Sequence, residues 1–170
     1  MSWQDYVNGY LVNWVDTNQD NKVYKNVCEH GALLGNGDGT VWAKTEGFNF
    51  GVFKVEVEKE DGSGPETIDV DEFANLKDSF ENQGTTSRKG GLRINKEKYF
   101  MVSFDADRNV MYLKKNGGGA CVAKSNLAYV VGTFNSSLKA NVGGKDLPQN
   151  PGTTNLVCEK LQAFLIENNL

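Results

Sequence analysis

Hydrophobic residues recur at helical spacing at the start of the chain. Ser2 and Asp5 form a capping-box pattern, and apolar residues continue at this spacing as far as Val15. The pattern predicts a first helix over residues 3–15 with an unusually wide apolar arc. One flank of the arc is aliphatic and holds Val7, Leu11 and Val15. The other flank is aromatic and holds Trp3, Tyr6 and Tyr10. We expect the aliphatic flank to pack on a sheet and the aromatic flank to have a different role.

The same spacing predicts two more helices. Asp69 can cap a helix that ends before Gly84. Its apolar face holds Val70, Phe73, Ala74, Leu76 and Phe80. Thr153 or Thr154 is expected to open a final helix. Its apolar side holds Val157, Cys158, Leu161, Phe164 and Leu165.

Short apolar runs between glycine-rich turns predict strands in the rest of the chain. In the first half they cover residues 27–34, 40–45 and 53–59, and an exposed loop follows over 60–65. The second half predicts five consecutive antiparallel strands and then a long loop. These strands cover residues 91–95, 98–105, 110–115, 120–124 and 127–135. Helices at both ends of a run of antiparallel strands indicate the α+β class, a sheet with helices packed on its faces.

Composition limits the kind of protein further. The 170 residues are 39% hydrophobic, which suits a single domain with one real core over residues 1–170. A formal net charge of −4 disfavours nucleic acid as a general partner, because phosphate binding depends on a strongly positive surface. The chain has neither a long apolar run nor the pattern of a secretory signal. We therefore expect a protein that stays in the cytoplasm.

The sequence gives little support for catalysis, a cofactor or a metal. Cys28, Cys121 and Cys158 are widely spaced and lack a CxxC pair, so we expect reduced thiols. The segment from Asp16 imitates the opening of a calcium loop but lacks its glycine and its bidentate glutamate. His30 is the only histidine, and we expect it to be structural or at the surface. We predict a binding protein that is not an enzyme and has no cofactor.

Four segments, in the same chain order, resemble the profilin family. They are the opening Met1-Ser2-Trp3-Gln4-Asp5-Tyr6-Val7, the strand Asp38-Gly39-Thr40-Val41-Trp42-Ala43, the hairpin from Gly91-Leu92-Arg93-Ile94 to Lys114-Lys115-Asn116-Gly117-Gly118-Gly119, and the closing helix from Val157 to Glu167. The resemblance implies an antiparallel sheet with the N- and C-terminal helices side by side on one face and the remaining helices on the other. It also implies three ligands: monomeric actin, proline-rich segments of actin-assembly proteins, and phosphoinositides. A cytoplasmic monomer associated with the cytoskeleton is expected.

The resemblance assigns the aromatic flank to proline-rich peptides. A polyproline II helix suits a groove of aromatic rings whose Tyr and Trp edges donate hydrogen bonds. The matching positions are Trp3, Tyr6, Trp42, Phe164 and Leu170. Phe164 and Leu170 lack the polar edges that relatives carry there, so we expect fewer hydrogen bonds to the peptide. Packing of these rings in the core is the alternative reading.

The resemblance places actin on the other side of the molecule. The matching positions are Lys98, Phe100, Val102, Lys114, Lys115, Asn155, Glu159 and Lys160. Ser103 and Leu156 stand where relatives often carry basic residues, which predicts weaker actin binding. Phosphoinositides would use the same basic residues, with Arg88, Lys89 and Arg93 nearby.

Three segments are longer than a compact profilin needs, namely residues 16–25, 47–66 and 136–150. These segments predict a divergent member with insertions. The altered basic positions and the insertions leave a second hypothesis open. In that hypothesis the chain is an adaptor for proline-rich peptides or membranes in which actin binding is weak or lost.

Overall fold

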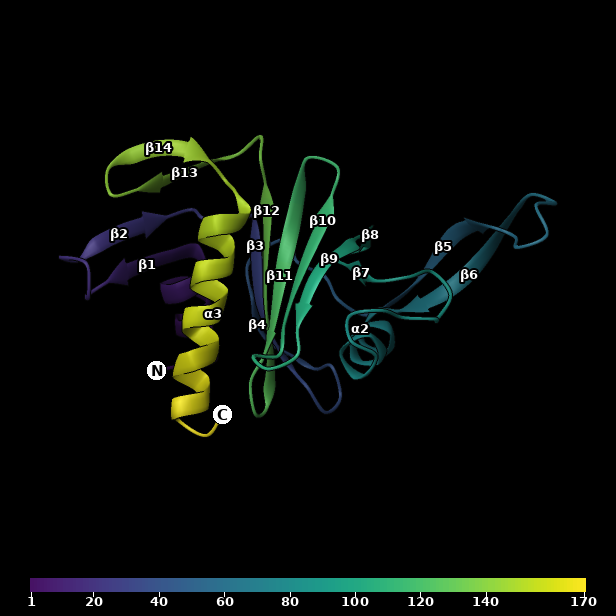
Figure 1. Ribbon diagram of the computed structural model, residues 1–170, viewed down its shortest axis with the longest axis horizontal. Helices are drawn as coiled ribbons and strands as arrows, with labels where there is room; N and C mark the ends of the chain where they lie inside the picture. The colour runs from purple at the N-terminus through teal and green to yellow at the C-terminus, as the bar shows by residue number, and fades with distance from the viewer.

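A six-stranded antiparallel sheet forms the centre of the computed structural model, which describes residues 1–170 (Figure 1). Its strands are β3 (His30–Gly35), β4 (Val41–Lys44), β9 (Phe100–Asp105), β10 (Val110–Lys115), β11 (Gly118–Lys124) and β12 (Ala128–Asn135). They lie in the order β4-β3-β12-β11-β10-β9, so β4 and β9 are the two edges. The predicted α+β class is confirmed, and the strand over residues 110–115 is correct to the residue. Consecutive antiparallel pairing is confirmed from β9 to β12, but the strand predicted over residues 91–95 lies outside this sheet, because residues 93–94 pair with residues 97–98 in a separate hairpin.

The sheet buries side chains on both faces. Successive residues of a strand point to opposite faces, so Val130 packs into one core and Val131 into the other. One face is covered by the two terminal helices and the other by the middle helix, α2 (Glu72–Glu81) (Figure 1). The arrangement implied by the family resemblance is therefore present. No helix is long and apolar enough to span a membrane.

The first helix is shorter than predicted. A single α-helical turn, α1 (Trp3–Tyr6), runs into a π-helical segment, η1 (Val7–Val12), and the chain then enters strand β1 (Asn13–Asp16). Ser2 and Asp5 form the predicted capping box. Val7 and Leu11 are fully buried as expected, but Val15 is 45% exposed, because β1 pairs with β2 (Lys22–Lys25) instead of continuing the helix.

The predicted starts of the other two helices are wrong by a few residues. Asp71, not Asp69, caps α2, and its side chain accepts a hydrogen bond from the Ala74 N–H at 3.1 Å. Asn150 caps the C-terminal helix, α3 (Pro151–Glu167), and Pro151 occupies its first turn. In both cases a different capping residue, a few positions from the predicted one, starts the helix. The apolar faces are confirmed, since Leu76 and Leu161 are fully buried.

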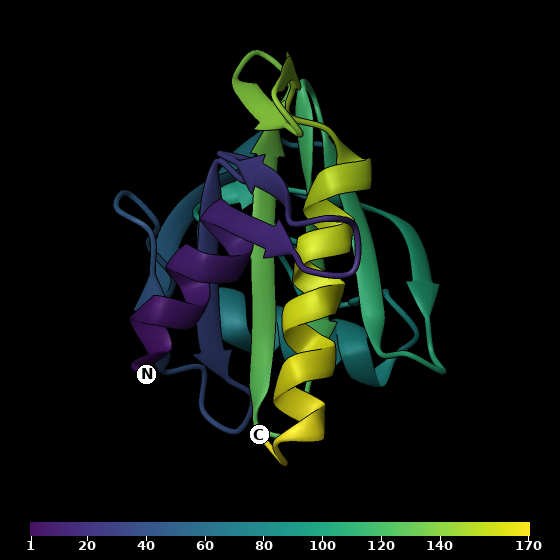
Figure 2. The ribbon, with the colours of Figure 1, turned by 90° about the vertical axis from the view of Figure 1, so that its left-hand side faces the viewer.

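Two of the predicted insertions form a sheet of their own. Strands β13 (Lys139–Val142) and β14 (Lys145–Pro148) replace the loop expected over residues 136–150. Gly143 and Gly144 both have positive φ, the geometry of a tight hairpin turn, which is why they join two strands. The order β1-β2-β13-β14 pairs the 16–25 segment with the 136–150 segment. Figure 2 shows this sheet beside the terminal helices, with the turn between β1 and β2 reaching toward α3.

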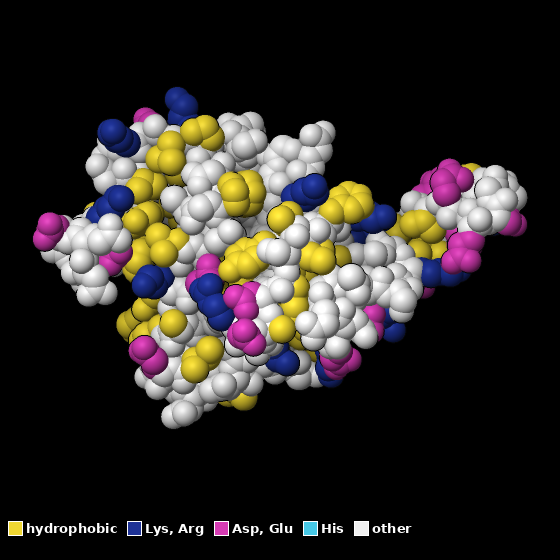
Figure 3. All heavy atoms as spheres, in the orientation of Figure 1, with side chains coloured by type: hydrophobic (Ala, Val, Ile, Leu, Met, Phe, Trp, Pro, Cys, Tyr) yellow, Lys and Arg dark blue, Asp and Glu magenta, His cyan; other side chains and the backbone are white.

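The third insertion forms an arm. Strands β5 (Val52–Glu58) and β6 (Pro65–Asp71) make a two-stranded ribbon that projects away from the central sheet (Figure 1). The expectation that Asp69 and Val70 belong to a helix is therefore wrong, because both pair with β5. Acidic side chains gather around the end of the arm (Figure 3). The exposed turn predicted after residue 59 is present at its tip.

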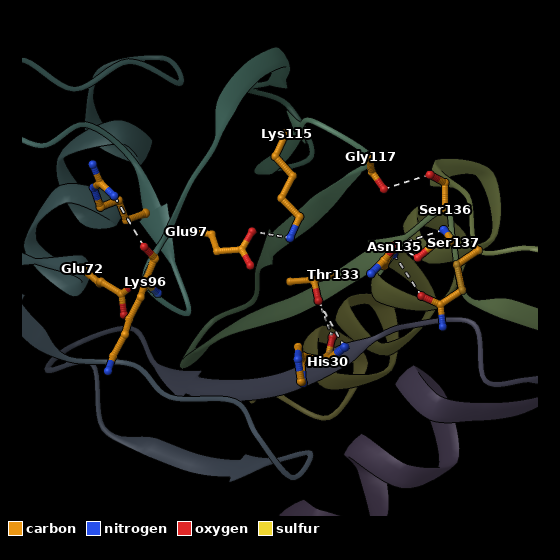
Figure 4. Close-up of polar contacts among 12 residues, drawn as sticks. His30, Glu72, Lys96, Glu97, Lys115, Gly117, Thr133, Asn135, Ser136 and Ser137 are labelled. Atoms are coloured by element: carbon orange, nitrogen blue, oxygen red, sulfur yellow. Dashed lines mark hydrogen bonds and ion pairs between the residues drawn. The ribbon is translucent and has the colours of Figure 1, made fainter. Parts of the chain in front are cut away.

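A buried carboxylate joins the arm to the rest of the molecule. Glu72 is fully buried at the start of α2 and accepts hydrogen bonds from the backbone N–H groups of Gly51 at 3.1 Å and Lys96 at 2.9 Å. Gly51 precedes β5, and Lys96 lies in the turn between β7 (Arg93–Ile94) and β8 (Glu97–Lys98) (Figure 4). Three segments that are separate in sequence are thus tied to one side chain.

Candidate functional site: an aromatic strip and an exposed sheet edge

Five aromatic rings form a continuous strip across the terminal helices and strand β4. The Trp3 ring centroid lies 4.8 Å from that of Trp42 and 5.9 Å from that of Tyr6. Phe164 of α3 continues the strip at 5.3 Å from Tyr6 and 5.7 Å from Tyr10. All five residues are half-buried. They are packed against the core and still present part of each ring at the surface.

The polar edges of this strip are free. The indole N–H groups of Trp3 and Trp42 and the hydroxyls of Tyr6 and Tyr10 make no hydrogen bond within the chain, and none is a buried orphan. A proline-rich segment offers carbonyl acceptors and flat ring faces but almost no N–H donors. A strip that combines flat apolar faces with free donors is complementary to such a segment.

Tyr10 was not among the positions that the resemblance assigned to this site. It lies beside Phe164, and burial, with Tyr6 and Glu167 as further causes, raises the pKa of its hydroxyl. The neutral hydroxyl can donate a hydrogen bond next to the ring that lacks one. The aromatic flank of the first helix already contained the signal, because Tyr10 falls on it with Trp3 and Tyr6.

Leu170, the remaining residue assigned to this site, lies just after the end of α3. Its N–H donates to the Leu165 carbonyl at 2.8 Å, and its own carbonyl accepts from the Asn126 N–H at 2.9 Å. The side chain is half-buried against the core of the helical face. These contacts anchor the end of the chain, and Leu170 contributes apolar surface without a polar edge.

A second candidate surface lies along the free edge of the central sheet. Strand β9 exposes Phe100, Met101 and Val102, of which Phe100 and Val102 are 57% and 58% exposed. Phe100 is paired with Lys114 of β10, and the Lys98 ammonium lies 5.5 Å from the Phe100 ring centroid. Hydrophobic side chains reach the surface over β9 and β10 beside Lys and Arg residues (Figure 3). The edge therefore combines apolar and basic groups.

A groove of about 380 Å³ connects this edge to the start of α3. Val102, Lys114 and Asn155 all line it, which brings together positions from three of the predicted elements. Glu159, one helical turn beyond Asn155, accepts a hydrogen bond from the Tyr112 hydroxyl at 3.1 Å and pairs with Arg108. Burial and the nearby Glu159 raise the pKa of Tyr112 to about 12, so this hydrogen bond persists at neutral pH.

Two of the lysines assigned to actin lie apart from the others. Lys115 points away from the groove, where its ammonium pairs with Glu97 and lies 5.6 Å from the Tyr99 ring centroid (Figure 4). Lys160 is exposed on the other side of α3 and faces Tyr10 and the turn between β1 and β2. The structure thus groups Lys98, Phe100, Val102, Lys114, Asn155 and Glu159, but not these two lysines.

The three additional basic residues lie in the segment between α2 and β9. The Arg88 side chain donates to the Asn75 amide oxygen at 2.8 Å, and Lys89 lies 3.5 Å from Glu66. Arg93 donates to the Gly90 carbonyl at 3.0 Å and is paired with Lys98 across the β7–β8 ladder. Each group already has one partner within the chain, and Arg88 and Lys89 remain exposed.

The cysteines are brought together by the fold. Cys28, Cys121 and Cys158 are free, buried thiols, and both Cys28 and Cys158 contact Gly132 of β12. Hydrogen bonding with the other two thiols, together with burial, raises the pKa of Cys158. These are the properties of core residues and not of nucleophiles.

Comparison with known proteins identifies the family. The family model described as Profilin matches residues 1–170. Profilin of Tetrahymena pyriformis is 41% identical over 140 residues, which cover 81% of this chain and 86% of that protein. The solved structure of profilin IB of Acanthamoeba castellanii is 26% identical, and the match covers 99% of this chain and 100% of that chain with a TM-score of 0.60.

Mouse profilin IIa, solved in complex with a double repeat from the FH1 domain of mDia1, shares the fold at 15% identity with a TM-score of 0.50, and the match covers 100% of both chains. The family and the fold expected from the four sequence segments are thereby confirmed. Profilins are non-enzymatic, actin-binding proteins. This chain belongs to the profilin family.

Proposed function

We propose that this protein binds monomeric actin and regulates its polymerisation, and that it holds proline-rich segments of actin-assembly proteins on a separate surface. The observation that carries the proposal is the separation of two surfaces with different chemistry. The aromatic strip lies over the terminal helices, and the exposed β9 edge lies at the far side of the central sheet. Two ligands could therefore be held at once.

The aromatic strip supports binding of proline-rich segments. Trp3, Tyr6 and Trp42 supply adjacent ring faces with free donors, and Phe164 and Leu170 extend the apolar surface. A member of the same family, mouse profilin IIa, is known in complex with a repeat segment of another protein. Burial of aromatic faces and hydrogen bonds to the free carbonyls of a polyproline II helix would together hold the peptide.

The β9 edge supports binding of an acidic protein surface. Phe100 and Val102 supply the exposed apolar centre that an interface needs, and Lys98 and Lys114 supply positive charge at its margin. Asn155 lines the groove from α3, and Glu159 accepts a hydrogen bond from Tyr112, which also lines it. Lys115 and Lys160, which lie elsewhere, would contribute through long-range attraction at most.

Anionic phosphoinositides form a weaker part of the proposal. Arg88, Lys89 and Arg93 lie close to Lys98 in the chain, and a cluster of this kind attracts acidic head groups. Their internal partners and the net charge of −4 limit this attraction. Co-sedimentation with vesicles that contain or lack phosphoinositide tests it, and binding independent of anionic lipid would remove it. A cytoplasmic location with the actin cytoskeleton follows from the proposed partners.

A bridging experiment tests the two-surface proposal. Immobilised polyproline is incubated with labelled actin monomers in the presence or absence of this protein. We expect actin to be retained only when the protein is present. Retention of the protein without actin would favour the adaptor alternative, in which actin binding is lost.

A further inference from the structure

The segment that was predicted as an insertion after Asp16 builds a pocket onto the aromatic strip. Strand β1 and the following turn lie across from α3 (Figure 2). Side chains of these segments line an open pocket of about 380 Å³. Two rings of the strip, Tyr10 and Phe164, form part of its lining, and Trp14 of β1 adds another ring. The pocket is therefore continuous with the strip, and Trp14 and the turn after β1 add to it residues that the family resemblance did not assign.

We propose that this pocket is an additional subsite that takes the part of a proline-rich segment extending beyond Trp3 and Trp42. The inference rests on the proposed binding of proline-rich segments and names what this chain adds to it. The expected ligand is a longer proline tract than the five-ring strip alone would hold.

The chemistry of the pocket fits proline residues. Trp14 is half-buried and is held in place by Tyr24, whose ring centroid lies 5.3 Å away. Ala163 is small and exposed beside Phe164, so a chain can approach α3 closely at that point. Rigid aromatic faces beside a small residue give pyrrolidine rings an apolar contact surface, while Asp16, Glu167 and the other polar lining residues make up the rest of the pocket.

The pocket also supplies donors for the carbonyls of the segment. Lys160 is exposed, has no carboxylate partner and lines the pocket, as does Asn18. A proline tract has carbonyl acceptors but lacks N–H groups, so it requires donors from the protein. The unpaired Lys160 ammonium can therefore donate to a peptide in this pocket, although it lies too far from the β9 groove to contribute to that surface.

The strand pairing that positions Trp14 explains why the pocket is formed. In the predicted helix over residues 3–15, Trp14 would lie on the helix surface with the other rings. In the structure the helix ends at Val12, and the β1–β2 ladder places Trp14 opposite Tyr24. The turn over residues 17–21 is fixed by Asp16, which is buried and accepts hydrogen bonds from the Asn18 N–H at 3.0 Å and the Gln19 side chain at 2.7 Å. The side of the pocket formed by Trp14 and this turn is thus preorganised.

Peptide length provides the test. Isothermal titration calorimetry is performed with oligoprolines of about six and about fourteen residues, which span roughly 19 and 43 Å as polyproline II helices. We expect Trp14→Ala to weaken binding of the long peptide about tenfold and to leave the short peptide unchanged. Unchanged affinity for the short peptide also shows that the variant is folded. Equal losses for both lengths, or no loss for either, would overturn the proposal.

A milder variant guards against a folding defect in Trp14→Ala. Lys160→Ala removes an exposed side chain from the pocket, and Lys145→Ala, on β14, removes one elsewhere. The first should weaken binding of the long peptide roughly threefold, and the second should have no effect. Identical behaviour of the two variants would contradict the subsite. A wild-type protein that binds neither peptide would overturn the proposed function itself, which is a different outcome.

Discussion

Trp3 and Trp42 lie with ring centroids 4.8 Å apart, although one begins the first helix and the other lies on the edge strand β4. The hydrogen bonds between Gln4 and the backbone of Lys44, at 2.8 and 3.3 Å, fix the helix to this strand. The pair is therefore held by the fold before any ligand arrives. Preorganised aromatic faces reduce the entropic cost of binding.

Replacement of Trp3 should remove binding of proline-rich peptides selectively. Trp3→Ala deletes the ring that contacts both Trp42 and Tyr6, and we expect at least a tenfold loss of affinity for oligoproline, on the order of 1.4 kcal/mol or more. Affinity for actin monomers should stay the same, because the β9 edge is distant. Calorimetry with each ligand measures both. A parallel loss of actin binding would indicate a general defect in folding.

Restoring a hydroxyl at position 164 should strengthen peptide binding. Phe164 lies between Tyr6 and Tyr10 in the strip and is half-buried, so Phe164→Tyr places one more donor at the surface. One added hydrogen bond is worth about 1 kcal/mol, or roughly a fivefold gain in affinity for oligoproline. An affinity no higher than that of the wild type would show that the peptide carbonyls do not reach this ring.

The β9 edge should carry actin binding. The double variant Phe100→Ala and Lys114→Glu removes an exposed ring and reverses a charge at paired positions, with little effect on the core. We expect at least a tenfold weaker complex with actin monomers and unchanged binding of oligoproline. Lys139→Glu on β13 is the matched control. If the control weakens actin binding as much, net charge and not this edge accounts for the effect.

Glu72 should make stability depend on pH. Burial raises the pKa of Glu72 from 4.5 to about 7, although the hydrogen bonds from the Lys96 and Gly51 N–H groups act to lower it. The stability gained from the protonated carboxyl is complete below pH 4.5 and is lost as pH rises through 7. The wild type should therefore unfold a few degrees lower at pH 8 than at pH 5.

Glu72→Gln is the control for this titration. The variant cannot ionise, so its thermal midpoint should change less between pH 5 and pH 8 than that of the wild type, whatever its absolute stability. The aspartates with lowered pKa values, Asp5, Asp38 and Asp61, are ionised throughout this range and do not contribute to the difference. Parallel curves for the two proteins would mean that Glu72 does not titrate in this window.

Much of the central fold could be predicted from local patterns. The strand over residues 110–115 and the buried faces of α2 and α3 follow from alternation and helical spacing of apolar residues, because these side chains pack in the core. The part of the strip on the first helix could also be predicted, because Trp3, Tyr6 and Tyr10 fall on one flank of that helix. These features depend on neighbours in sequence.

The remaining features depend on partners far apart in the chain. Residues 13–16 leave the helical pattern because β2 pairs with them, and β2 in turn pairs with β13, more than one hundred residues later. The local pattern predicts Asp69 as a cap, because nothing local shows that β6 pairs with β5. The cluster of Cys28, Cys121 and Cys158 around Gly132 has no signal in their spacing. The pocket beside Trp14 likewise depends on strand pairing that the local sequence does not show.

Spontaneous polymerisation of pyrene-labelled actin tests the central claim most directly. With the protein in excess over actin monomers, binding through the β9 edge should slow nucleation and lengthen the lag, and the Phe100→Ala and Lys114→Glu double variant should do so less. Trp3→Ala should behave like the wild type in this assay. A polymerisation curve that the wild-type protein leaves unchanged would contradict actin binding and leave only the role of an adaptor for proline-rich segments.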